Sequence, residues 1–271
     1  MRSASTAALG RARERWEALL TQRGGEEIEL ARSIFALVDI LRKNPALLGA
    51  LEDNARAPED RATLAHNVVH GKVADEVTEL LQGLAREYWS EKDDLGRALE
   101  ALGARTLMVG AQREGKLSEV EEQLYVIMRT LRANRDLRIA VGDTYFEVGR
   151  RQELVRNLFA PYLNYTVELL VRAVANTMHG YPPIRSLTYY MEMAAEQGLR
   201  IVASVTSTVP LTREQEERLT AILSRSYNKD VKVHVTIDPA VIGGIRIHVA
   251  DDVIDGTLAS RLRGVREAFS N

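Results

Sequence analysis

The segment GGIRIHVADDVIDG, from Gly243 to Gly256, decides the fold of the carboxy-terminal part of the chain. Its first half alternates apolar and polar residues, and successive side chains of a strand point to opposite faces. The segment VKVHVTI, residues 231–237, has the same alternation. Between them, DPAVIGG supplies a proline and two glycines, which favour a turn. We therefore expect two half-buried strands paired as a hairpin, each with its apolar residues on one face: Val231, Val233, Val235 and Ile237 in the first strand, and Ile245, Ile247 and Val249 in the second.

Three aspartates of this segment have simple structural interpretations. Asp251 and Asp252 lie where the second strand gives way to a turn. Asp255, or Thr257 nearby, is placed to cap a helix carrying Leu258, Leu262, Val265 and Phe269. An alternative stays open, in which these carboxylates and two histidines facing each other across the hairpin, His234 and His248, form a catalytic site.

The rest of the tail completes a small α/β domain. Gly198 is typical of a helix end, and LRIVASVTST after it is typical of a strand. Thr212 and Gln215 have the spacing of a capping box for a helix that carries Leu219, Ile222 and Leu223. The order strand, helix, strand, strand, helix predicts a domain over residues 199–271.

Residues before Gly198 read as helical, because apolar residues recur at intervals of three and four. A shift of ninety residues superimposes identical residues in two segments of this part, which predicts two similar helical bundles, residues 1–105 and 106–198. Chance resemblance between amphipathic helices is the alternative. The identical pairs are Leu41 with Leu131, Arg42 with Arg132, Asn44 with Asn134, Leu47 with Leu137, Ala50 with Ala140, Asp53 with Asp143, Arg61 with Arg151, Leu64 with Leu154 and Asn67 with Asn157.

Composition excludes several classes of protein. The 271 residues carry a formal net charge of -2 at pH 7, which gives no basis for binding nucleic acid. The chain has no cysteine, so disulfides and thiolate-bound zinc are excluded. No apolar run approaches the roughly 20 residues of a membrane-spanning helix, and the first residues lack the apolar stretch of a signal peptide.

Metal and cofactor motifs are weak. HNVVH places His66 and His70 four residues apart on one helical face, but Asn67 stands where a zincin has glutamate. Gly71 follows, so the pair is expected in a last helical turn, where a cation is favoured. No glycine-rich stretch has the spacing of a phosphate-binding loop, and we expect no cofactor, metal or catalytic residue.

The tail resembles one known family. VTSTVPLTREQEERL, followed by DPAVIGGIRIHVADDVIDGTLASRL, is similar to the carboxy-terminal signature of the delta subunit of the rotary F-type ATP synthase, called oligomycin-sensitivity-conferring protein in mitochondria. Residues before about Glu100 have no counterpart in an ordinary delta subunit, and a second copy of the helical domain would explain them, as in enlarged actinobacterial forms. The signature residues are Gly243, Gly244, Asp255, Gly256 and Leu262.

The resemblance implies a non-catalytic peripheral-stalk, or stator, subunit. Delta subunits bind amino-terminal segments of alpha subunits through the helical domain and engage a b-type stalk through the carboxy-terminal domain, so that rotor torque drives ATP synthesis. The location implied is the cytoplasmic face of the plasma membrane, reached only through the complex. We expect the alpha segment to dock in the second bundle at Leu107, Met108, Val167, Leu170 and Val174. A helical adaptor unrelated to the synthase and a carboxylate-dependent enzyme remain alternatives.

Overall fold

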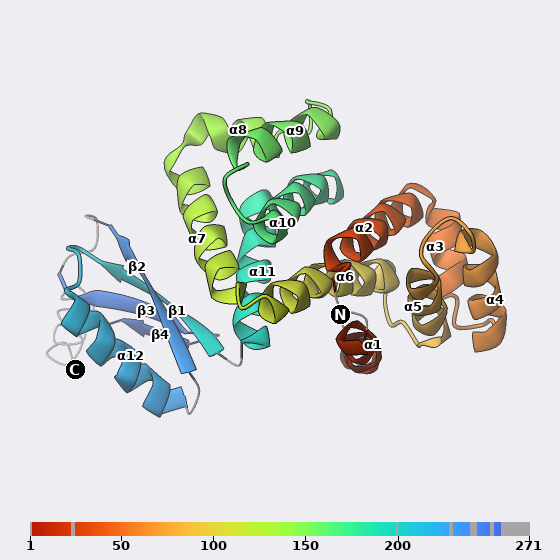
Figure 1. Ribbon diagram of the computed structural model, residues 1–271, viewed down its shortest axis with the longest axis horizontal. Helices are drawn as coiled ribbons and strands as arrows, with labels where there is room; N and C mark the ends of the chain where they lie inside the picture. The colour runs from red at the N-terminus through yellow and green to blue at the C-terminus, as the bar shows by residue number, and fades with distance from the viewer. Residues whose placement is uncertain are drawn as a thin grey trace, which may run out of the picture. The chain divides into compact units, whose positions relative to one another are not determined.

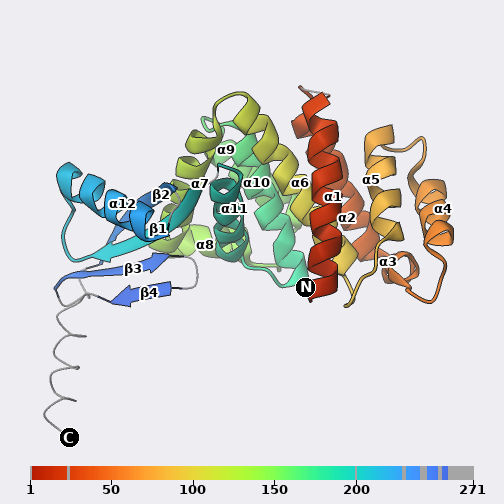
Figure 2. The same cartoon turned by 90° about the horizontal axis from the view of Figure 1, so that it is seen from below.

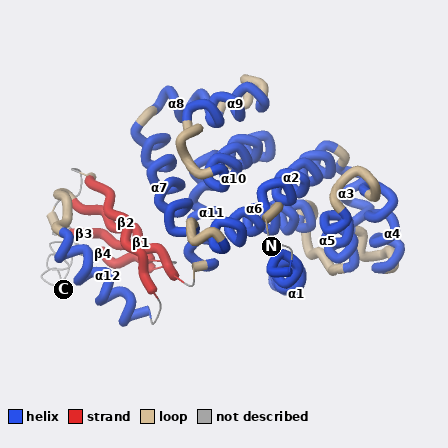
Figure 3. The backbone as a smooth tube through the Cα atoms, in the orientation of Figure 1, coloured by secondary structure: helices blue, strands red, loops and turns tan. Residues whose placement is uncertain are grey.

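The computed structural model describes residues 2–22, 25–198, 200–227, 230–238, 243–249 and 252–255. Its internal contacts divide the chain into a helical unit, residues 1–190, and a second unit, residues 191–271. The chain is mostly helical, and all described strands lie in the second unit (Figures 1 and 3).

Two series of helices make up the helical unit. The first is α1 (Ser3–Gln22), α2 (Glu27–Lys43), α3 (Pro45–Glu52), α4 (Pro58–Val69), α5 (Asp75–Arg86) and α6 (Asp94–Arg113). The second is α7 (Leu117–Ala133), α8 (Arg135–Gly142), α9 (Val148–Leu158) and α10 (Asn164–Ala175), followed by the short helix η1 (Asn176–His179) and by α11 (Pro183–Gln197), which runs past residue 190.

The helix lengths recur in order. Helices α2 to α5 have 17, 8, 12 and 12 residues, and α7 to α10 have 17, 8, 11 and 12. Leu41 and Leu131 lie at equivalent positions near the ends of α2 and α7, and both are fully buried. Leu64 and Leu154 likewise lie in the corresponding helices α4 and α9. The proposed division at residue 105 stays a prediction, and α6 passes through that residue without a break.

Helix α6 is the central element of the helical unit. It lies between α1 and α10 in both views (Figures 1 and 2). Sixteen of its 20 residues are buried, because neighbouring helices cover it on all sides. On the α1 side, the indole Nε1 of Trp16 donates to Oγ1 of Thr106 at 2.9 Å. Helix α6 therefore belongs to the packing of both series.

Three glycines of α6 stand seven residues apart, and two of them, Gly103 and Gly110, allow α2 to approach closely. The three are Gly96, Gly103 and Gly110. A methyl group on Gly103 would lie 2.5 Å from Cε1 of Phe35, and one on Gly110 would lie 2.9 Å from Cβ of Glu27. Only glycine leaves room for α2 at these two positions. This regular spacing was a sequence signal for the contact, and the periodicity of apolar residues alone does not reveal it.

The second unit has a four-stranded sheet in the order β2-β1-β3-β4. The strands are β1 (Arg200–Ser207), β2 (Asp230–Ile237), β3 (Ile245–Val249) and β4 (Asp252–Asp255), with α12 (Arg213–Tyr227) between β1 and β2. β1, β3 and β4 are antiparallel neighbours, and β2 is parallel to β1. Leu223 of α12 packs with residues of the sheet, including Val205 and Ile247, in one core.

The predicted hairpin between residues 231–237 and 245–249 is wrong. Strand β2 pairs with one side of β1 and β3 with the other. The crossover through α12 returns the chain parallel to β1 on one side of that strand, and β3 pairs antiparallel with its other side. His234 and His248 are both in register with Ser204 of the intervening strand, so they are not cross-strand partners.

Several local predictions for the tail are confirmed. The backbone N–H of Gln215 donates to Oγ1 of Thr212, and the N–H of Thr212 donates to Oε1 of Gln215 at 2.8 Å, which is the expected capping box. Gly243 and Gly244 have φ values of 62° and 81°, which glycine adopts without strain. Asp255 ends β4, and the helix that it was predicted to cap lies outside the described residues, as do Asp251, Gly256 and Leu262.

Candidate partner-binding sites

The five residues predicted to contact an alpha segment are all interior. Each is at most 8% exposed, so none is available on the surface of this structure. Helix α2 lies against α6, and α2 and α6 both contact α10. The predicted docking place is thus covered from within the chain, and docking there stays a prediction. The residues are Leu107, Met108, Val167, Leu170 and Val174.

A buried ionic cluster joins the three helices. Nε of Arg172, on α10, donates to Oε2 of Glu100, on α6, at 2.7 Å. Nη1 of the same guanidinium donates to Oδ1 of Asp39, on α2, at 2.7 Å. Asn176 and Tyr190 also donate to Glu100. The cluster therefore ties the first series of helices to the second.

The environment of Glu100 favours its charged form. Burial by itself raises the pKa of this carboxyl, but the Arg172 guanidinium and the Asn176 amide outweigh that effect and hold the pKa below its ordinary value. An ionised Glu100 accepts several hydrogen bonds and stays compensated in the interior. This is a structural role, because every partner of Glu100 is another residue of the helical unit.

Exposed large apolar side chains gather on the helical hairpin formed by α8 and α9. Tyr145, between the two helices, is 89% exposed, and its ring meets that of Phe146 edge-on with centroids 5.8 Å apart. Ile139, Leu154 and Leu158 are between 40% and 49% exposed. These five residues form the hairpin face. Its concentration of apolar groups is characteristic of a protein contact.

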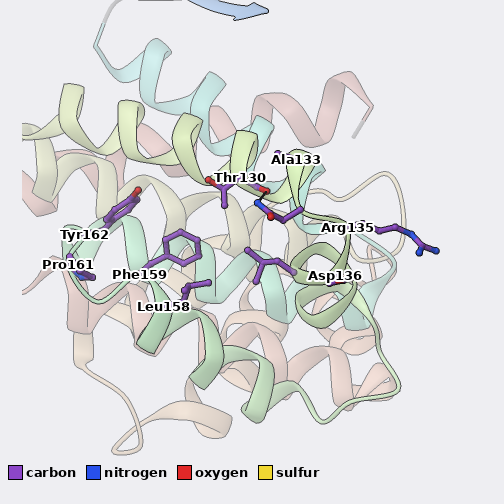
Figure 4. A pocket seen from close by; sticks show the side chains of 10 residues that line it. Thr130, Ala133, Arg135, Asp136, Leu158, Phe159, Pro161 and Tyr162 are labelled. Atoms are coloured by element: carbon purple, nitrogen blue, oxygen red, sulfur yellow. Dashed lines mark hydrogen bonds between the residues drawn. The ribbon is translucent and has the colours of Figure 1, made fainter. Parts of the chain in front are cut away.

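A hollow of about 470 Å³ adjoins the hairpin face (Figure 4). Leu158 and Phe159 line it from the end of α9, and Thr130 and Ala133 line it from α7. Arg135 stands at its rim and extends outward. The predictions from the sequence did not include this hollow, because its walls come from helices whose relative placement the sequence does not state.

The described residues provide no support for a metal-binding or catalytic site. The rings of His66 and His70 stack with centroids 4.4 Å apart at the end of α4. Within the described ranges, no three histidine, cysteine, aspartate or glutamate side chains are grouped so that they could hold a metal ion. Asp252 accepts a hydrogen bond from the hydroxyl of Tyr227 at 2.8 Å, which joins β4 to α12.

Among the described helices, none combines the length and apolar character needed to cross a bilayer.

Comparison with known proteins places the chain in a family. Residues 104–269 match the model of the ATP synthase delta (OSCP) subunit. Three relatives, each called ATP synthase subunit delta, match almost from end to end. The protein of Beutenbergia cavernae is 39% identical over 270 residues, covering 100% of both chains. That of Streptomyces avermitilis is 34% identical over 99% of this chain and 98% of its own.

The relative from Acidothermus cellulolyticus is 32% identical over 100% of both chains. The family model begins near the middle of α6, whereas these actinobacterial relatives also match the helices before it. The first series of helices is therefore a feature shared with them. On these matches, the chain belongs to the ATP synthase delta (OSCP) subunit family and is a non-catalytic subunit of that complex.

Proposed function

We propose that this chain is a peripheral-stalk subunit of a proton-translocating ATP synthase. In this role it links amino-terminal segments of alpha subunits, at the catalytic head, to a b-type stalk, so that the head does not turn with the rotor. The observation that carries the proposal is the full-length match to ATP synthase delta subunits. Its location would be the cytoplasmic face of the plasma membrane, peripheral and held there by the complex.

The architecture suits a linker that carries mechanical load. The first series of helices has a buried core, and the ionic cluster of Arg172, Glu100 and Asp39 ties the second series to the first. The second unit has its own core around the sheet. We assign the alpha contact to the helical unit and the stalk contact to the second unit. A linker under torque needs slow dissociation at both contacts, which extensive apolar interfaces provide.

Reconstitution tests this function directly. Catalytic head and b stalk are mixed with and without the full chain, and their co-sedimentation and ATP synthesis in proteoliposomes are measured. We expect both to require the chain, while ATP hydrolysis by the isolated head is unchanged. Equal co-sedimentation and synthesis without the chain would refute the stator role.

Because α2 contacts both α6 and α10, a partner that docks between these helices in place of α2 requires α2 to leave. Departure of α2 would expose Ile34, Leu37 and Leu41, which are at most 2% exposed in this structure. Exposure costs about 1.5–3 kcal/mol for each large apolar side chain. Hydrogen exchange of the α2 amides tests the requirement, because an alpha peptide docking there must deprotect them. Binding with α2 still protected would reject this location and leave the stator role intact.

A further inference from the structure

A pocket of about 490 Å³ opens in the helical unit, and helices of both series line it. Its exposed lining residues include Thr6 on α1 and Arg185 and Tyr189 on α11. The side chains of Arg42 on α2 and Asn176 on η1 are buried. We propose that this pocket binds a nucleoside monophosphate, a function separate from the stator role.

The pocket gathers buried polar atoms that have no partner within the chain. Over the described residues, five buried side-chain nitrogen and oxygen atoms lack a hydrogen-bond partner, and three of them belong to residues that line this pocket. They are Nη1 of Arg42, Nε of Arg97 and Oδ1 of Asn176. Buried polar groups of folded proteins nearly always have a partner. The pocket therefore offers two donors and one acceptor to a ligand.

Arg42 is held in place by a carboxylate. Its Nε and Nη2 donate to Asp93 at 3.0 and 3.2 Å. Among the described residues, Asp93 is the only one other than glycine with a positive φ, and such strain persists where the surroundings fix a residue. Nη1 of Arg42 is 3.6 Å from Oε2 of Glu100, which is too long for a hydrogen bond. The counterpart of Arg42 ninety residues on, Arg132, is exposed, so the helix repeat does not by itself bury this arginine.

The charges of the pocket favour an anion. Arg42, Arg97 and Arg185 line it, against the single carboxylate of Glu100. Glu100 already accepts hydrogen bonds from three residues of the chain, and no described carboxylate pairs with Arg185. Burial and then the Arg42 guanidinium lower the pKa of His179, which follows Asn176 on η1 and thus senses a positive potential. A phosphate group accepts several charge-assisted hydrogen bonds and matches these donors.

Aromatic side chains favour a flat ring as the body of the ligand. The Arg185 guanidinium lies over the Tyr181 ring, with Cζ 5.4 Å from the ring centroid, and Tyr189 is 44% exposed. Nucleic-acid bases stack on tyrosine rings and on guanidinium groups. The free Oδ1 of Asn176 accepts from an N–H of a base or an O–H of a sugar. A nucleoside monophosphate combines the ring, the anion and these donors in one molecule.

Calorimetric titration of the full chain tests the ligand class. The probes are the monophosphates of adenosine, guanosine, cytidine and uridine, with adenosine and inorganic phosphate as partial ligands. We expect at least one monophosphate to bind, and adenosine and inorganic phosphate to bind at least about tenfold more weakly, because each has only part of the complementary chemistry. No binding of any monophosphate would overturn the proposal, and so would inorganic phosphate binding as tightly as the best of them.

Two variants at exposed positions test the location. Thr6→Trp should obstruct the pocket, and Arg185→Ala should weaken binding about tenfold, because a charge-assisted contact is lost. The matched controls are Ala7→Trp and Arg132→Ala, at exposed positions that do not line the pocket. They should bind as the unmodified chain does, and circular dichroism should be the same for all four variants. Unchanged binding in both Thr6→Trp and Arg185→Ala would place the nucleotide outside this pocket and overturn the assignment.

Discussion

The guanidinium of Arg172 bridges the carboxylates of Glu100 and Asp39, with Nε 2.7 Å from Oε2 of Glu100 and Nη1 2.7 Å from Oδ1 of Asp39. Its side chain is 2% exposed. This buried cation thereby compensates the buried carboxylate of Glu100, on α6, and the partly exposed carboxylate of Asp39, on α2. The contact joins α10 to Glu100 and Asp39. Both of these residues precede residue 104, where the match to the family model begins within α6.

Replacing Arg172 with methionine should destabilise the helical unit by about 3–5 kcal/mol, because Glu100 is left charged and buried without its cation. The free energy of unfolding is measured by chemical denaturation. Arg213→Ala is the control, since its ion pair with Glu217 is solvent-exposed and should contribute about 0–1 kcal/mol. Similar small losses for both variants would show that the buried cluster does not stabilise the unit.

Acid should destabilise the protein through Glu100. Its pKa is held below the ordinary value in the folded state, because Arg172 and Asn176 outweigh the effect of burial. Such a group contributes stability above its unfolded pKa, about 4.3, and loses it as the pH falls through the folded pKa. The free energy of unfolding should therefore decline below about pH 4, and this decline should be shallower in Glu100→Gln. If the free energy of unfolding of Glu100→Gln fell with pH as steeply as that of the unmodified chain, groups other than Glu100 would cause the acid sensitivity.

Gly103→Ala should destabilise the helical unit by about 1–3 kcal/mol, because the new methyl group would meet the Phe35 ring. Gly83→Ala in α5 is the matched control. Its new methyl group has no heavy atom within 4 Å, so it should stabilise the helix by up to about 1 kcal/mol. Thermal unfolding of the two variants should therefore shift in opposite directions. A stabilised Gly103→Ala would mean that α2 and α6 are not closely packed.

Thr212→Ala should cost about 1 kcal/mol in the stability of the second unit, because the N–H of Gln215 loses its side-chain acceptor. Thr212→Ser keeps a hydroxyl at the same place and should restore most of that stability. Denaturation monitored by a probe in the second unit provides the measurement. An alanine variant as stable as the serine variant would show that the capping box does not stabilise the second unit.

Local features of the fold were predictable wherever neighbouring residues decide them. Thr212 and Gln215 form a capping box because both partners lie within one turn. Ile247 and Val249 are buried, and Arg246 and His248 are exposed, because the period of a strand fixes the face of each residue. The hairpin prediction failed because strand order depends on the α12 crossover, which the strand sequences do not contain.

The sequence by itself indicated the secondary structure of most segments, the match of identical residues ninety positions apart and the resemblance to delta subunits, because these depend on residue spacing and on short motifs. Only the tertiary structure decided which apolar side chains are buried and which are exposed. Leu107 and Val167 have the apolar character of a docking site, but α2 and the other neighbouring helices bury them. Leu158 has the same character and remains exposed at a hollow. Periodicity identifies an apolar stripe, and long-range packing determines whether that stripe becomes core or surface.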